Sequence, residues 1–421
     1  MSTSTHTHGD RTYTGRTNTA DGFVASPGAP LIVALHGGTY SSMYFDIPGY
    51  SLLDRAASRG IPVIALDRPS YGGSTPLETD DSIILANADA LTEAIGSIWA
   101  DHGGQAPGVV LLGHSIGGAV ATAIAAAQPS WPLVGLALSG CLVRVPQESR
   151  GAWEALPPIP MIDLPVPMKD QVMFGPVGTY ADDMPAASHP SNTPVPKAEL
   201  LDITGGWLER RANVCGRVTV PVHHRQGEFD ALWVTNQDEI DDFRSGFGAS
   251  ESVDTALQPG SGHCIDFHLP SERFQTSQLD FAQQCAGSWP ARGELVSPTV
   301  EKLGPPRGRN SIARCGSASA RTAVGLRARC VPQHYWGRGV ERAAANCVSK
   351  LVGAAAGRPT GGVGPRSGGL RPAVWPLRVR WWRRARRQAA DRARAGGRAA
   401  GRARRGRWRV QGTAGARPGT A

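Results

Sequence analysis

The sequence predicts an α/β fold with a mostly parallel sheet and helices on both of its faces. Short apolar runs rich in Val, Ile and Leu recur between residues 31 and 257, as in strands that are buried on both sides. Stretches with helical apolar spacing or a high Ala content alternate with these runs. No apolar run reaches the length of a membrane span.

The expected elements follow in order along the chain. The first 28 residues are polar, with weak strand potential at 12–17, and we expect them to form a disordered arm. Core strands are predicted at residues 31–35, 62–67, 109–112, 132–138 and 218–222, with a weaker strand at 252–257. Helices are predicted at residues 83–100, 118–127, 238–247 and 271–286, the last of which closes the sheet edge.

The charge divides the chain into an acidic body and a basic tail. Residues 1–290 hold 15 Lys and Arg against 31 Asp and Glu, a net charge of −16. Residues 291–421 hold 29 Lys and Arg against 4 Asp and Glu, a net charge of +25. We therefore expect a polar arm over residues 1–28, one α/β domain over 29–288, and an Arg-, Ala- and Gly-rich disordered tail over 289–421.

An insertion interrupts the regular alternation at about residues 142–200. It contains eleven prolines, which a regular sheet cannot absorb, together with several Met and aromatic residues. An irregular segment of this length inside a domain is typical of a lid over an apolar pocket. The alternative is a surface excursion with a small core of its own.

The candidate nucleophile is Ser115, in the pattern Gly-x-Ser-x-Gly between a buried strand and a helix. Gly113 and Gly117 lack a Cβ, so strand and helix can approach closely while Ser115 occupies a strained turn. The N–H of Ile116 lies at the helix N-terminus, where it can stabilise a developing oxyanion. The sequence therefore predicts that the Ser115 hydroxyl projects out of the sheet at this turn.

Three further segments supply the groups that a serine nucleophile needs. His36-Gly37-Gly38 follows the first core strand, and we expect the Gly38 N–H to be the second oxyanion donor. His263 lies in a Gly-rich loop and is the candidate base, while Asp230 follows a predicted strand and is the candidate acid. Glu228 and Glu148 are the alternative acids.

Residues from about 30 to 286 resemble a serine α/β-hydrolase of the lidded esterase, lipase and thioesterase type. The resemblance rests on the segments His36–Gly38, Asp67–Ser74, Gly113–Gly118, Gly227–Asp230 and Gly262–His263. One departure is Ser70, where the family pattern usually has Gly. The resemblance implies an α/β-hydrolase fold and acyl transfer to Ser115, with His263 as base, Asp230 as its partner and no cofactor.

The sequence-based hypothesis is thus a cytoplasmic hydrolase of a small-molecule carboxylic ester or thioester. An acyltransferase, lyase or perhydrolase with the same residues is the alternative within the fold. We name as substrate-contacting residues Tyr40, His114, Met173 and Phe174, although His114 is also suited to packing behind the turn. A metal site at His263, Cys264, Asp266 and His268 is disfavoured, because its ligands are spaced too closely.

The location and the tail are predicted from composition. The N-terminus lacks the basic and apolar regions of a secretory signal, and the domain's four cysteines include no Cys-x-x-Cys pair. These features favour reduced thiols in the cytoplasm. For the tail, binding to nucleic acid or to an anionic membrane competes with a reading-frame shift in GC-rich DNA, which we favour. If the tail does bind nucleic acid, the protein belongs to a different functional class.

Overall fold

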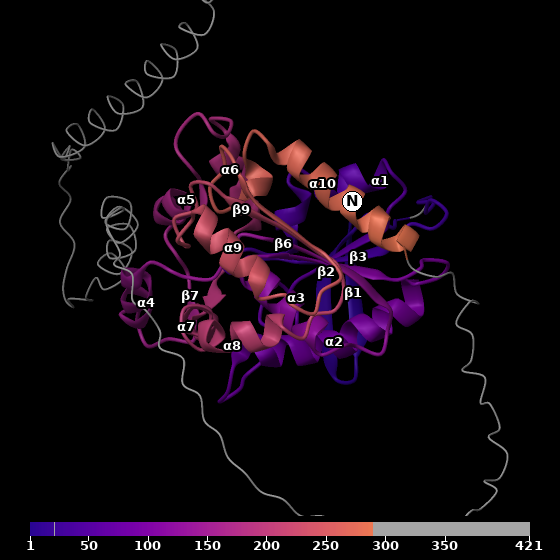
Figure 1. Cartoon of the computed structure of the whole chain (residues 1–421), viewed down its shortest axis with the longest axis horizontal. Coiled ribbons are helices and arrows are strands. Elements are labelled where there is room, and N and C mark those ends of the chain that lie inside the picture. Colours follow the sequence, from indigo (N-terminus) through magenta and orange to yellow (C-terminus); the bar gives the residue numbers. More distant parts are fainter. Residues whose placement is uncertain (21, 289–421) are drawn as a thin grey trace, which may run out of the picture. The chain divides into compact units, whose positions relative to one another are not determined.

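The fold is described from a computed structural model of the chain, over residues 1–20 and 22–288. An eight-stranded sheet lies at its centre (Figure 1), in the strand order β1-β2-β4-β3-β5-β6-β9-β10. The strands are β1 (Ser2–His8), β2 (Arg11–Thr17), β3 (Leu31–Leu35), β4 (Val63–Leu66), β5 (Val109–His114), β6 (Leu133–Ser139), β9 (Val222–Gly227) and β10 (Val253–Gln258). The six strands from β4 to β10 pair in parallel, which confirms the predicted sheet. The predictions for the tail, residues 289–421, lie outside the described residues.

Helices cover both faces of this sheet (Figure 1). They are α1 (Leu52–Ala57), α2 (Ile83–His102), α3 (Ile116–Ala126), α8 (Gly206–Cys215), α9 (Gln237–Ser245) and α10 (Ser271–Ser288), with short 3-10 turns at Ser42–Asp46 and Ile265–Phe267. In β3, Leu31, Val33 and Leu35 belong to a core shared with α2, α3, α8 and α9. Ile32 and Ala34 point the other way, into a core shared with α1 and α10. Because side chains alternate along a strand, they pack into two buried layers, one on each face of the sheet.

The insertion at residues 142–200 folds into short elements. They are α4 (Gln147–Glu154), β7 (Met161–Ile162), α5 (Val166–Met173), α6 (Met184–Ser188), a 3-10 turn at His189–Ser191, β8 (Val195–Pro196) and the start of α7 (Lys197–Ile203). The strands β7 and β8 form a separate two-stranded sheet. Several apolar side chains of the insertion, such as Trp153 and Met173, join the core shared with α1 and α10. The insertion therefore packs onto the domain rather than forming a separate core.

The N-terminal residues do not form the disordered arm that we expected. Residues 2–17 form an antiparallel hairpin, and β2 also pairs antiparallel with β4 at the edge of the sheet. Alternating Thr residues suit a strand because their β-branched side chains fit a pleated surface. Tyr13 is fully buried against the core, and Gly15 lets β2 approach β4 so closely that a Cβ would lie 2.2 Å from the Ala65 oxygen. The polar composition of this segment did not indicate β2, whose one large buried side chain is that of Tyr13.

The strand predicted at residues 218–222 lies further along the chain. β9 begins at Val222, because Pro221 has no N–H to donate to a neighbouring strand. His223 and His224 are consequently inside β9, and Gly227 is its last residue. The shift brings the end of β9 directly before Asp230.

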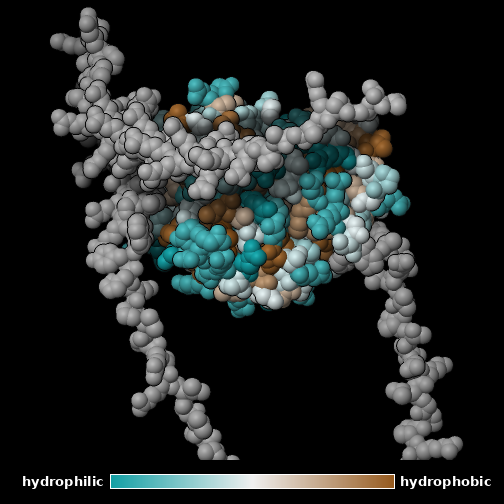
Figure 2. Space-filling model, turned by 45° about the horizontal axis from the view of Figure 1, so that its top comes forward, coloured by the Kyte–Doolittle hydropathy of each residue, from teal (hydrophilic) through white to brown (hydrophobic). Residues whose placement is uncertain are grey.

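The surface of the described part is mixed in character. On the face shown in Figure 2, hydrophilic residues surround small, separate hydrophobic patches. The exposed large hydrophobic residues of the described part are Met1, Val24, Ile159, Val166, Val177, Leu201, Phe229 and Leu269. No described helix combines the length and the apolar character that crossing a membrane requires. The cysteines Cys141, Cys215, Cys264 and Cys285 are all buried and free.

Five buried histidines are held in the neutral form. Burial lowers the pKa of His36 and His224 to about 3, and the pKa of His223 and His268 to about 4. Burial and the neighbouring histidines also hold the pKa of His114 well below its usual value. The unfolded chain binds protons at these histidines below about pH 6.5, whereas the native state does not. Native stability should therefore rise with pH from the native pKa values to about 6.5.

We expect the free energy of unfolding to fall steeply as the pH is lowered from 6.5 to 5. His224→Gln should reduce this loss by about 1–2 kcal/mol, because one group that binds a proton only on unfolding is removed. Urea unfolding at several pH values measures the effect. Ser245→Ala is the control, because it removes no titratable group from an exposed position. An identical pH dependence in wild type and His224→Gln would contradict the explanation.

Candidate active site

Ser115 occupies a strained backbone turn between β5 and α3. Its φ of 55° and ψ of −122° lie outside the regions that L-residues normally adopt. The turn is fixed from both sides: the Ser115 N–H donates to the Ser139 oxygen at 2.8 Å, and its carbonyl accepts from the N–H of Gly118 at 2.8 Å. This geometry places the serine at the junction of strand and helix, as the sequence pattern predicts.

The two glycines of the motif permit the close packing that the turn needs. A Cβ on Gly117 would lie 2.2 Å from the Leu35 oxygen, and one on Gly113 would lie 2.6 Å from the Gly117 oxygen. Both neighbours are backbone atoms, which cannot move aside independently. The predicted reason for the glycines is thus confirmed.

His263 and Asp230 form a buried hydrogen-bonded pair. The distance from His263 Nδ1 to Asp230 Oδ2 is 2.7 Å, and both side chains are essentially inaccessible to solvent. Asp230 also accepts from Gln226 Nε2 at 2.6 Å and from the Leu232 N–H at 2.8 Å. An ionised carboxylate can accept all three bonds, so His263 donates through Nδ1 and its Nε2 remains available as a base.

The imidazole of His263 lies beside the turn that carries Ser115. The rings of His263 and His114 have centroids 4.9 Å apart. A Cβ on Gly140 would touch both rings, at 2.9 Å from His114 and 3.2 Å from His263. Within the described residues, no hydrogen bond joins the Ser115 hydroxyl to His263; in enzymes such contacts often shorten only when substrate binds.

Gly38 and Ile116 adjoin each other next to Ser115. A Cβ on Gly38 would lie 2.9 Å from Ile116 Cδ1, and one on Gly37 would lie 2.9 Å from Ser115 Cβ. Ile116 is the first residue of α3, where a helix leaves its N–H without an intrahelical partner. The two predicted oxyanion donors therefore belong to adjacent backbone segments.

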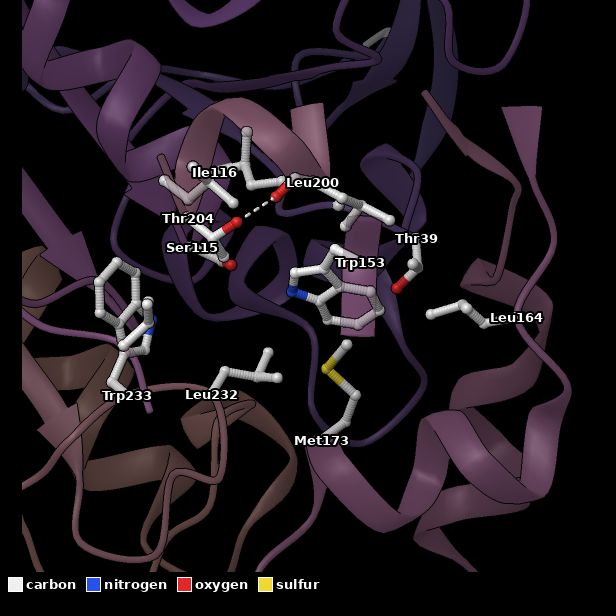
Figure 3. A pocket seen from close by; sticks show the side chains of 13 residues that line it. Thr39, Ser115, Ile116, Trp153, Leu164, Met173, Leu200, Thr204, Leu232 and Trp233 are labelled. Carbon is white, nitrogen blue, oxygen red and sulfur yellow. Dashed lines mark hydrogen bonds between the residues drawn. The ribbon is translucent and has the colours of Figure 1, made fainter. Parts of the chain in front are cut away.

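A cavity opens in front of Ser115 (Figure 3). The empty space between its lining atoms is about 530 Å³, a volume that includes open solvent. Its lining contains no charged side chain and consists of Gly38, Thr39, Ser115, Ile116, Val145, Trp153, Leu164, Met173, Leu200, Ile203, Thr204, Leu232 and Trp233. Five of these residues, from Val145 to Leu200, come from the insertion. The cavity suits a neutral, largely apolar group.

Only Met173 of the four predicted substrate-contacting residues lines this cavity. Tyr40, which follows Thr39, is fully buried. The Lys169 ammonium lies over its ring, with Nζ 3.4 Å from the ring centroid. His114 stacks on Tyr44 behind the Ser115 turn, with ring centroids 4.5 Å apart. Phe174 packs against Phe267, Tyr180 and His268. Trp153, Leu200 and Trp233 also line the cavity, and in the sequence only their apolar character distinguishes them.

Glu228 and His268 are engaged in other contacts. Glu228 accepts from the Gly260 N–H at 3.0 Å and makes no contact with His263, and the Glu148 side chain lies outside the described part. His268 donates to the Cys264 oxygen, and its Nε2 accepts from the N–H groups of Gly175 and Gly262. Within the described residues, no group of three or more His, Cys, Asp or Glu is arranged to hold a metal ion.

A family model described as the alpha/beta hydrolase family matches residues 32–274, which include every element of this site. The chain belongs to this family. Its members share the strand, turn and helix that carry Ser115 here. The family assignment agrees with the parallel sheet and with the strained serine.

The chain is also similar to curated proteins over part of its sequence and to solved structures in its fold. The chain is 31% identical over 110 residues to a protein phosphatase methylesterase 1 from Rattus norvegicus, covering 26% of this hydrolase and 27% of the relative. The match therefore spans about a quarter of the length of this curated relative. A thermophilic esterase from Thermogutta terrifontis aligns with a TM-score of 0.50 at 16% identity, over 68% of this chain and all of that chain. A monoglyceride lipase variant from Saccharomyces cerevisiae aligns with a TM-score of 0.50 at 13% identity, over 68% and 94%. At these identities the structures show the fold alone.

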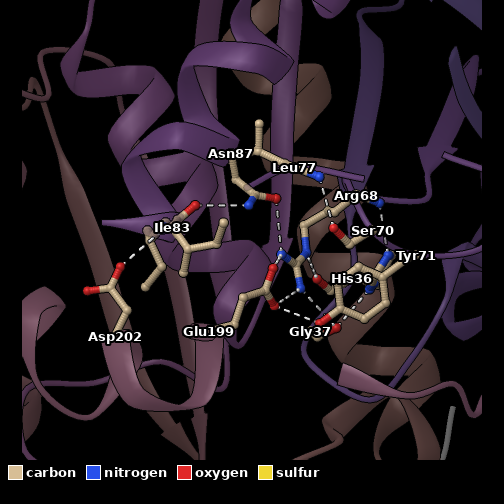
Figure 4. A network of polar contacts seen from close by, with 11 residues as sticks. His36, Gly37, Arg68, Ser70, Tyr71, Leu77, Ile83, Asn87, Glu199 and Asp202 are labelled. Atoms are coloured by element: carbon tan, nitrogen blue, oxygen red, sulfur yellow. Dashed lines mark hydrogen bonds and ion pairs between the residues drawn. The ribbon is translucent and has the colours of Figure 1, made fainter. Parts of the chain in front are cut away.

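A buried ion pair connects the insertion to the Gly38 loop in this hydrolase (Figure 4). The Arg68 guanidinium binds both carboxylate oxygens of Glu199, at 2.6 and 2.9 Å, and both side chains are completely buried. Glu199 also accepts from the Tyr71 hydroxyl at 2.6 Å. Arg68 further donates to the carbonyls of His36 at 2.8 Å and Gly37 at 3.4 Å. One guanidinium thus joins α7 to the loop after β3.

These contacts orient the peptide that carries the Gly38 N–H. His36 Nε2 accepts from the Arg68 N–H at 3.1 Å, so the neutral ring bears its proton on Nδ1 and donates to the Gly37 oxygen at 2.7 Å. A trans peptide is planar, and its C=O and N–H point in opposite directions. Holding the Gly37 carbonyl against Arg68 and His36 therefore turns the Gly38 N–H away from them. Hydrogen bonds to the carbonyl also polarise the peptide and strengthen its N–H as a donor.

We expect Glu199→Gln to lower the free energy of unfolding by about 3–5 kcal/mol, because it leaves the Arg68 charge buried without a counter-charge. The double variant Arg68→Met/Glu199→Leu should recover most of that stability. It should still lose activity, because the Gly37 carbonyl loses a donor. Urea unfolding and ester turnover measure the two effects.

The exposed pair Arg150–Glu154 provides the control, and Glu154→Gln should change stability by about 0.5 kcal/mol or less. Full activity in the double variant would show that Arg68 does not position the loop.

Proposed function

We propose that this protein is a serine esterase that hydrolyses a carboxylic ester or thioester through an acyl-Ser115 intermediate. The observation that supports the proposal most strongly is the combination of the strained Ser115 turn with the buried His263–Asp230 pair beside it. Family membership and the similarity to a methylesterase agree with ester-bond hydrolysis. The uncharged cavity suits a small acyl or alcohol group.

In the proposed acylation step, His263 Nε2 removes the proton of the Ser115 hydroxyl as its oxygen attacks the substrate carbonyl carbon. The carbonyl oxygen takes the electron pair and becomes an oxyanion, which the N–H groups of Gly38 and Ile116 stabilise. Loss of one such donor typically raises the barrier by about 2.7–4 kcal/mol. The carbon–oxygen or carbon–sulfur bond then breaks, and His263 passes its proton to the leaving alcohol or thiol.

Deacylation repeats these steps with water. His263 removes a proton from water, the hydroxide attacks the acyl carbon, and Ser115 leaves with the proton that His263 returns. Asp230 keeps the imidazole in the required tautomer and stabilises its protonated form. Burial keeps His114 neutral, so it places no positive charge beside His263.

We expect a fluorophosphonate probe to label the wild-type protein and the Ser115→Ala variant to remain unlabelled. Turnover of a chromogenic short-chain ester should fall by about 10⁶-fold in that variant, since the nucleophile is lost. Ser245→Ala, on the exposed surface of α9, is the matched control and should keep both activities. Labelling that persists in Ser115→Ala would place the nucleophile elsewhere.

Asp230→Asn should lower kcat by about 10⁴-fold, because an amide favours the wrong imidazole tautomer. Glu228→Gln is the control, since Glu228 makes no contact with His263. Steady-state kinetics with the same ester separates the two carboxyl groups. If Glu228→Gln shows the large loss and Asp230→Asn does not, the assignment of the acid is wrong.

Product analysis separates hydrolysis from two of the alternatives on the same residues, acyl transfer and perhydrolysis. A hydrolase releases the free acid even when an alcohol acceptor is present. An acyltransferase gives mainly the new ester, and a perhydrolase gives the peracid when hydrogen peroxide is added. Predominant transfer to an added acceptor would overturn the proposal of a hydrolase while leaving Ser115 as the nucleophile.

A further inference from the structure

Thr39, which follows Gly38, is held in a conformation that threonine rarely adopts. Its φ is 64°, in the left-handed region that disfavours β-branched side chains. Strain of this kind persists only where the surroundings fix it, and it concentrates at ligand-binding positions. Contacts with neighbouring residues must therefore hold Thr39 in this conformation.

The insertion holds Thr39 through its carbonyl. Lys169 of α5, itself buried, donates to the Thr39 oxygen at 2.5 Å, and the N–H of Thr193 donates to the same oxygen at 3.1 Å. The Lys169 ammonium also donates to the Asn192 side chain and lies over the ring of Tyr40. Two donors thus fix the carbonyl, and neither uses the Thr39 hydroxyl.

The hydroxyl of Thr39 faces the cavity without a partner. Thr39 is 3% exposed, and its Oγ1 has no hydrogen bond within the described residues. Figure 3 shows this oxygen directed between Trp153 and Leu164, while Ser115 lies on the other side of the Trp153 ring. A buried hydroxyl without a partner is destabilising, and a bound oxygen atom would remove that penalty.

Two other polar side chains of the lining, those of Thr204 and Trp233, already have partners within the protein. The Thr204 hydroxyl donates to the Leu200 oxygen at 2.8 Å, and the Trp233 indole N–H donates to the Gly140 oxygen at 2.9 Å. Because the lining carries no charged side chain, a charged ligand group would be buried without a counter-charge. The group that meets Thr39 must therefore be neutral, and an oxygen atom of the substrate can accept the one proton of the hydroxyl.

We propose that Thr39 is a specificity-determining residue whose hydroxyl donates a hydrogen bond to a second oxygen of the substrate. The substrate class is a neutral ester with a keto, ether or further ester oxygen, separated from the reacting carbonyl by an apolar stretch that lies along Trp153. This proposal rests on the proposed esterase function and adds its substrate preference.

The test compares matched esters that differ in one group. In straight-chain esters, each methylene in turn is replaced by an ether oxygen, first in the acyl chain of p-nitrophenyl esters and then in the alcohol chain of acetate esters. At one position the wild-type protein should prefer the oxygen-bearing ester over its all-methylene counterpart by at least about tenfold in kcat/KM. A ratio within one variant cancels any uniform loss of activity.

Thr39→Val should abolish most of this preference, because it removes the hydroxyl and keeps the β-branched shape. Thr39→Ser should retain the preference, because it keeps the donor. Thr204→Val is the matched control: its hydroxyl is already bonded within the protein, so the ratio should stay as in the wild type. Fluorophosphonate labelling of each variant shows that Ser115 is still correctly placed.

The outcomes separate the two proposals. If simple esters are hydrolysed but no oxygen-bearing ester is preferred, or if Thr39→Val keeps the preference, the assignment of Thr39 is wrong and the esterase function stands. If no ester is hydrolysed and the probe does not label Ser115, the proposed function itself fails.

Discussion

The strained turn at Ser115 is the constraint on which the rest of the site depends. A residue with this backbone conformation holds its side chain at the strand–helix junction only if strand and helix pack closely on both sides. Gly113 and Gly117 permit that contact, since a Cβ at either position would overlap backbone atoms of its neighbours. The same packing brings the loop of Gly37 and Gly38 against the serine. Nucleophile and oxyanion loop are therefore positioned by one close contact between main chains.

Buried polar groups transmit this arrangement to the insertion. Arg68 links the His36 and Gly37 carbonyls to Glu199, and Lys169 links the Thr39 carbonyl to α5. Burial lowers the pKa of Lys169 to about 7, which reflects how completely the insertion encloses it. Charged groups in such places are destabilising unless all their hydrogen bonds are made, so their presence restricts the loop to one conformation. The insertion thus both encloses the cavity and fixes the backbone beside Ser115.

Prediction from sequence succeeded where a local signal has one physical cause. Runs such as Leu31–Leu35 predicted buried strands because every residue is apolar, and the motif glycines predicted a tight turn because only glycine fits there. It failed where the signal is carried by partners far along the chain. The Thr-rich N-terminus is polar, yet β2 pairs with β4 and inserts Tyr13 into the core. Ser70 departs from the usual Gly, and its φ of 71° shows the conformation for which a glycine would be suited.

The sequence alone therefore determined the fold class, the alternation of strands and helices, and the identities of Ser115, His263 and Asp230 as candidates. These depend on residue type and on spacing over a few positions. Only the tertiary structure decided that Asp230 rather than Glu228 meets His263, that Trp153 and Leu200 line the cavity while Tyr40 and Phe174 do not, and that Arg68 pairs with Glu199. Each of these contacts joins segments that are far apart in the chain. Whether the side chains meet depends on how the helices, strands and loops that carry them pack together.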